Sequence, residues 1–193
     1  MASVMARNAL VAAAVAILAF AGFPQSVFAA PAESFRAFGQ GSELTLPLNC
    51  LSTGVGPLNL CPASDTCACT SIVGHGTAAV MGGPITYTAT VATNLSAPSG
   101  SCDEAVGTAT LVSTTAPGNQ VVPNFTGTLC ATPSTAASRT TLTANVVSAT
   151  YFIDGANSRG MFHGATGSGS VTGSRDNAAF AVLGSVIGTI KLP

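Results

Sequence analysis

Cysteines are the residues whose chemistry is easiest to predict in this chain of 193 residues. Thiolates could hold a zinc ion or exchange electrons, yet the C-x5-C-x-C spacing from Cys61 to Cys69 matches neither a paired CxxC zinc site nor a CxxC redox motif. An even number of cysteines in an exported chain is instead typical of disulfide bonds. The six candidates for such bonds are Cys50, Cys61, Cys67, Cys69, Cys102 and Cys130.

One pairing of these cysteines is favoured. Cys102 and Cys130 each border a predicted strand, and a bond between them would close a loop of about 29 residues, worth about 3 to 4 kcal/mol in the chain-entropy model. Cys67 and Cys69 need partners elsewhere, because alternate residues of a strand point the same way. The crowding of cysteines between residues 50 and 69 predicts a loop region held by disulfides.

Acid–base groups are scarce, and none belongs to a catalytic motif. His75 and His163 each adjoin a glycine, and no HxH or HExxH spacing supports a metal site. No G-x-S-x-G elbow is present for a nucleophilic serine. Tyr87 and Tyr151 fall in predicted strands, where we expect them to pack with the hydroxyl group at the rim. We therefore predict no catalytic residue, no bound metal and no cofactor.

Charge is scarce throughout the sequence. The chain has 6 Lys plus Arg against 7 Asp plus Glu, so 7% of its residues are charged where about 25% is usual. A net charge of -1 offers no basic stripe for nucleic acid, and we predict no nucleic-acid partner. A hydrophobic content of 47% argues against intrinsic disorder.

Residues 1–29 are typical of a secretory signal peptide. Arg7 precedes an apolar run over residues 9–22, and small residues lead to a predicted cleavage after Ala29 or Ala30. The run is short for a bilayer span of about 20 residues. Barrels that cross membranes display aromatic girdles, whereas this chain has 0 Trp and 2 Tyr. We expect a secreted or periplasmic protein without stable membrane insertion.

Beyond residue 66 the sequence predicts β-strands separated by Gly, Pro, Asn and Ser clusters. Residues 85–91 alternate apolar side chains with threonine, which is typical of a half-buried strand. Pro123 indicates an edge strand or a bulge. The strands that we predict cover residues 69–81, 85–92, 106–112, 120–130, 140–153, 161–163, 168–172 and 178–190.

These strands predict an all-β fold, either a single antiparallel barrel of about eight strands or a β-sandwich. Residues 67–193 are assigned to this β domain. Residues 30–66 are interpreted as an irregular N-terminal segment with a cysteine-rich loop, in which Leu44, Leu46 and Leu48 mark a first strand. We expect disulfide bonds to cross-link and stabilise this fold.

A glycine-rich stretch from Gly160 to Gly173 indicates bends, bulges or close backbone approach. Its pattern, G-x-F-x-G-A-T-G-x-G-x-V-x-G followed by a strand that ends in G-T-I, resembles the C-terminal hairpin of the allene oxide cyclase and dirigent-like barrels, over about residues 155–190. The resemblance implies an eight-stranded barrel with an apolar cavity. It also implies a dimer or trimer, so that a homo-oligomer is possible for this chain.

A barrel of this kind could hold a small apolar ligand. Ile85, Val91, Val146 and Val182 are expected to face its interior. The principal candidates for the cavity are Tyr87, Tyr151, Phe152, Phe162, His163 and Phe180.

Three functions stay open. The first is a non-catalytic binding or surface-structural module, which the scarcity of titratable groups favours. The second is a cyclase or isomerase of the barrel type that the hairpin resembles, with His163 or Tyr151 as its acid or base. The third is a pilin-like or adhesive subunit, which would be an incomplete sandwich that a strand completes.

Overall fold

The computed structural model describes residues 31–44, 67–94, 102–131, 144–176 and 181–193. In these residues the chain forms strands and two short 3-10 turns, η2 (Ala79–Met81) and η3 (Gly160–Phe162). The strands are β1 (Glu33–Leu44), β2 (Cys67–Ala78), β3 (Gly83–Asn94), β4 (Cys102–Ser113), β5 (Gln120–Val121), β6 (Pro123–Ala131), β7 (Ala144–Ile153), β8 (Thr166–Asp176) and β9 (Ala181–Lys191).

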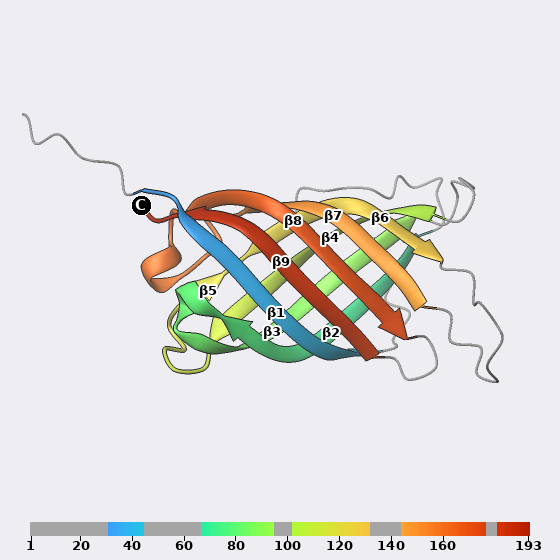
Figure 1. Ribbon diagram of the computed structural model, residues 1–193, viewed down its shortest axis with the longest axis horizontal. Helices are drawn as coiled ribbons and strands as arrows, with labels where there is room; N and C mark the ends of the chain where they lie inside the picture. The colour runs from blue at the N-terminus through green and yellow to red at the C-terminus, as the bar shows by residue number, and fades with distance from the viewer. Residues whose placement is uncertain (1–30, 45–66, 95–101, 132–143, 177–180) are drawn as a thin grey trace, which may run out of the picture.

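The long strands close into one antiparallel barrel (Figure 1). Each pairs with its neighbour in sequence, β4 pairs with both β3 and β6, and β1 pairs with β9 to join the two ends of the sheet. The short β5 lies beside β4, ahead of β6. The predicted all-β fold is confirmed, and it is a closed eight-stranded barrel rather than a sandwich. Closure leaves none of the eight long strands as an edge.

Alternation along the strands separates an apolar interior from a hydroxyl-rich exterior. On β3 the side chains of Ile85 and Tyr87 point inward, while those of Thr86 and Thr88, which alternate with them, are exposed. The strand register continues this inner face on the neighbouring strands. Tyr87 lies opposite Gly74 on β2 and opposite Leu111 on β4. The low charge of the sequence therefore corresponds to an outer surface whose polarity comes from threonine and serine.

Several predicted strands differ from the observed ones. β1 lies inside the segment interpreted as irregular, and it begins ahead of the leucines that suggested a first strand. Pro123 does not belong to an edge strand, because it starts β6, which pairs with β4 on one side and β7 on the other. Pro123 itself pairs with Ile153 on β7, and the pairing with β4 is interrupted here, between Asn124 of β6 and Val121 of β5. The predicted strand over residues 161–163 is wrong, since Gly160 adopts a φ of 64° and opens the 3-10 turn η3.

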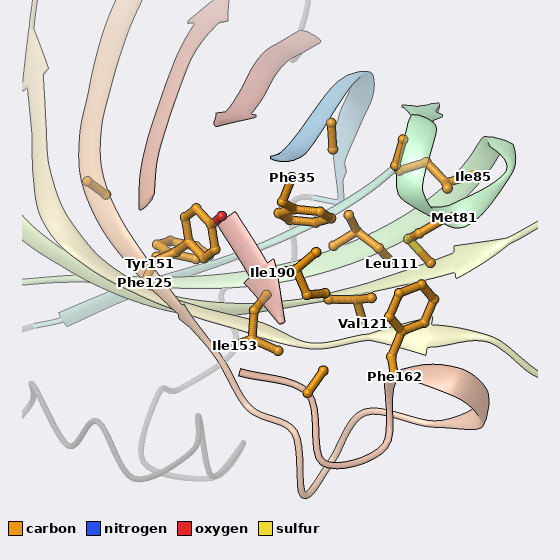
Figure 2. Packing of buried hydrophobic residues seen from close by; sticks show 14 residues of the cluster. Phe35, Met81, Ile85, Leu111, Val121, Phe125, Tyr151, Ile153, Phe162 and Ile190 are labelled. Carbon is orange, nitrogen blue, oxygen red and sulfur yellow. The ribbon is translucent and has the colours of Figure 1, made fainter. Parts of the chain in front are cut away.

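One end of the barrel, which we call the base, is filled by a hydrophobic core. The β2–β3 and β7–β8 connections meet here, together with β5 and the C-terminus of the chain (Figure 1). Phe35, Val121, Phe162 and Ile190 are each 0% exposed. Figure 2 shows Phe162 and Met81, which come from the two 3-10 turns, packed beside Val121 beneath the strands.

Polar side chains fasten the connections of the base. Ser158 accepts a hydrogen bond from the Val122 amide at 3.0 Å and donates one to the Asp154 carbonyl at 2.8 Å. Ser113, which is fully buried, donates to the Met81 carbonyl at 2.9 Å. Hydrogen bonds from the Asn157 side chain hold the pKa of Asp154 below its usual value. These bonds satisfy buried polar groups and hold the turns against the barrel.

The predicted disulfide is confirmed in the described part of the chain. Cys102 and Cys130 lie opposite one another on β4 and β6 and are joined by an S–S bond of 2.06 Å. The bond lies at the end of the barrel away from the base, which we call the far end. Cys69 is also disulfide-bonded, whereas Cys50 and Cys61 lie outside the described residues. No helix of the described segments has the length and apolar character that a membrane crossing requires.

Candidate ligand cavity

Above the base, the barrel contains a partly open apolar cavity with a volume of about 140 Å³. Its walls come from the inward positions of most of the long strands. Tyr87 and Val91 line it from β3, Leu111 from β4, Phe125 from β6, and Val186 from β9. An eight-stranded barrel is just wide enough for its side chains to fill the interior, so a cavity requires small residues at some inward positions.

Glycines supply those small residues. Gly39 on β1 lies opposite Gly184 on β9, which in turn lies opposite Gly173 on β8, and all three line the cavity. A Cβ atom at Gly184 would meet only the Thr172 carbonyl oxygen, at 3.8 Å. The inner wall at Gly184 therefore borders open space rather than a packed side chain.

Inward glycines, Gly39 among them, also make room for the Tyr87 ring. A Cβ atom at Gly39 would lie 2.7 Å from Cε1 of that ring, and Cβ atoms at Gly41 and Gly74 would each lie 2.7 Å from its hydroxyl oxygen. The ring thus lies flat across β2 and β1, where only glycine permits such an approach. Burial raises the pKa of the Tyr87 phenol above its usual value.

Tyr151 makes a similar arrangement on the other side of the barrel. Its ring meets the inward positions of Gly169 on β8 and Gly188 on β9. Its hydroxyl group donates a long hydrogen bond of 3.5 Å to the Thr189 carbonyl, and its ring contacts Phe35 edge to face with centroids 5.9 Å apart. Burial raises the pKa of Tyr151 to about 12. Tyr151 belongs to the packed core and does not line the cavity.

Some of the polar residues next to the cavity point out of the barrel and others point into it. Thr172 and Ser185 contribute to the lining, yet they occupy outward positions and their hydroxyl groups contact each other at 2.8 Å. Glu43 occupies an inward position beyond the cavity, opposite Ile72 toward the far end of the barrel. Among the described lining residues, Tyr87 is therefore the one with a polar side chain on the inner face.

Only some of the predicted cavity residues line the cavity in the structure. Tyr87, Ile85, Val91 and Val182 line the cavity as expected. Phe152 does not, because it points outward and is 43% exposed. The two adjacent residues of β7, Tyr151 and Phe152, cannot share one face of a strand.

The remaining candidates lie elsewhere. Phe162 is buried in the base and closes it, and His163, next to it in the sequence, is exposed. His75 is exposed on the outer face of β2, where its Nε2 contacts the Gln40 amide nitrogen at 3.0 Å. Phe180 and the side chain of Val146 lie outside the described residues.

Sequence reasoning missed much of the wall. Ala37, Leu111, Val171 and Val186 line the cavity and were not among the candidates. The signal that could have found them is the alternation of the strands extended across the glycine-rich hairpin, which pairs Val171 with Val186 on the inner face.

The described segments bring together no group of three His, Cys, Asp or Glu side chains that could hold a metal ion. No family model matches this chain, and the comparisons with curated proteins and with solved structures found no match. The resemblance of the hairpin to allene oxide cyclase and dirigent-like barrels therefore stays a prediction.

Proposed function

We propose that this protein is an exported binding module that holds a small apolar ligand inside its barrel. The observation that carries the proposal is the cavity of about 140 Å³ bounded by aliphatic and aromatic side chains and by glycine. Engineered apolar cavities of about 150 Å³ stay free of water and take up benzene or xenon. A ligand with about six heavy atoms fits a space of this size.

The shape of the interior supports binding rather than structural filling. A structural module gains stability from a packed core, and a cavity forfeits contacts that larger side chains would make. Here the base is filled, whereas glycine occupies the inward positions of β1, β8 and β9 beside the cavity. A barrel with a filled base and a glycine-lined cavity fits ligand binding better than a purely structural role.

A catalytic function has less support from the arrangement of polar side chains than ligand binding has. A cyclase or isomerase needs polar groups that converge on the reacting atoms. His163 is exposed beside the base, Tyr151 lies in the core, and Tyr87 alone presents a polar group on the described inner wall. Export is supported by the signal-peptide pattern and by the Cys102–Cys130 bond. The homo-oligomer stays a prediction.

The test is binding of fluorobenzene to the purified chain with its disulfides intact, followed by fluorine NMR. We expect saturable binding to the native protein and its loss in Gly184→Leu, because the new side chain extends into the open space beside β9. Thr189→Leu, which adds a similar side chain on the exposed face of the same strand, is the matched control and should bind normally. Equal binding by both variants, or none by the native chain, would contradict the proposal.

A further inference from the structure

We infer that the ligand is an uncharged molecule with one acceptor oxygen, such as a small ketone, and that the Tyr87 hydroxyl group donates a hydrogen bond to that oxygen. This inference rests on the proposed function and specifies its ligand class. It starts from a difference between the two tyrosines: the Tyr151 hydroxyl has the Thr189 carbonyl as an acceptor. The Tyr87 hydroxyl makes no hydrogen bond with any residue that the structure describes.

The position of Tyr87 makes its hydroxyl group available to a ligand. The ring lines the cavity, and its hydroxyl oxygen reaches the inner face of β1 at Gly41, which lies opposite Val182 of the cavity wall. A hydroxyl group that a ligand covers gains by meeting an acceptor, because a donor that becomes buried without one carries the full cost of desolvation. A pure hydrocarbon in the cavity would leave this donor unpaired.

The charged side chains that the structure describes favour a neutral ligand. Those of Arg36, Arg159 and Lys191 do not line the cavity, so a carboxylate there would have no counter-ion among them. Glu43, on the inward face toward the far end, is not among the lining residues. A cationic ligand would find no carboxylate among the lining residues. Burial of an unpaired charge is strongly unfavourable, which leaves a neutral molecule.

The test compares cyclopentanone with methylenecyclopentane, which has the same shape and lacks the oxygen. In Tyr87→Phe we expect the affinity for the ketone to fall by about fivefold to tenfold, the effect of one neutral hydrogen bond, while the affinity for the hydrocarbon is unchanged. Tyr151→Phe is the matched control and should bind both molecules like the native chain, because Tyr151 does not line the cavity.

A second measurement needs no variant. The carbonyl stretching band of cyclopentanone bound to the native chain should lie at lower frequency than in a hydrocarbon solvent, since a hydrogen bond weakens the C=O bond. An unshifted band, or equal losses of ketone and hydrocarbon affinity in Tyr87→Phe, would overturn the inference and leave the apolar binding module standing. If the native chain binds neither molecule, the inference and the proposed function fall together.

Discussion

The base and the cavity region of the barrel are built from the same strands, yet one is filled and the other is hollow. At the base, inward positions carry large side chains such as Phe35 and Ile190, and Phe162 closes the space from outside the sheet. In the cavity region, Gly39, Gly173 and Gly184 occupy inward positions. The difference shows that residue size at inward positions, and not strand number alone, decides where this barrel has a core and where it has room.

The largest expected effect is a loss of the base. Phe162→Ala should lower the free energy of unfolding by about 3 to 5 kcal/mol, because the side chain is fully buried and its removal leaves a void. Denaturant unfolding followed by circular dichroism measures this. Phe152→Ala, which truncates an exposed phenylalanine of β7, is the control and should change stability by about 0.5 kcal/mol or less. Similar losses in the two variants would contradict the assignment of the base as the core.

A disulfide holds the barrel at the far end, beyond the cavity. The double change of Cys102 and Cys130 to serine should lower the free energy of unfolding by about 2 to 4 kcal/mol, since it frees the unfolded chain from a closed loop. Amide hydrogen exchange should accelerate more in the paired ends of β4 and β6 near the disulfide than in Ile190 and Val121 of the base. Uniform acceleration across the barrel would show that the two regions do not open separately.

The glycines provide a matched pair within the inner wall. Gly76→Ala should lower the free energy of unfolding by about 1 to 3 kcal/mol, because its Cβ atom would collide with the backbone of Phe38. Gly184→Ala should be tolerated within about 0.5 kcal/mol, since its Cβ atom enters open space. The same denaturant assay measures both, and a reversed order would contradict the position of the hollow.

Sequence patterns predicted the barrel class because alternation and turn signals depend on local chemistry. Residues 85–91 alternate cleanly, and the Cys102–Cys130 pair follows from two strand boundaries. The patterns failed at β1, whose inward positions after Ala37 are Gly39, Gly41 and Glu43 and so carry no hydrophobic signal, while the large Phe38 points outward and is 52% exposed. Hydrophobic periodicity reports packed positions, so it is weakest where a wall is made of glycine.

The position of the cavity depends on register, which local patterns do not supply. Tyr151 and Phe152 are equally aromatic, and the pairing of Tyr151 with Gly169 settles which of them enters the barrel. The hollow itself results from the coincidence of Gly39, Gly184 and Gly173 on three adjacent strands. Gly39 is far from Gly173 and Gly184 in the sequence. The three glycines therefore come together only when β1 pairs with β9 and closes the sheet.

The smallest expected effect is on the pH dependence of stability, and it comes from the raised pKa of Tyr151. Burial in the core raises the pKa of Tyr151 to about 12, whereas the usual pKa of an exposed tyrosine is 10.0. Between these values the unfolded chain releases a proton that the folded chain retains, so the free energy of unfolding falls as the pH rises from about 10 to about 12. Below that range this contribution is fully present.

Absorbance of tyrosinate, measured against pH in the folded chain, should therefore show both phenols titrating above the usual range, because burial raises both pKa values. Tyr151→Phe should remove the higher titration and flatten the decline in stability above pH 10. A ligand that binds Tyr87 should raise only the titration that remains in this variant, because its hydrogen bond favours the protonated phenol. A shift of the Tyr151 titration in the native chain would instead place the ligand against the core and erase the distinction between the two regions.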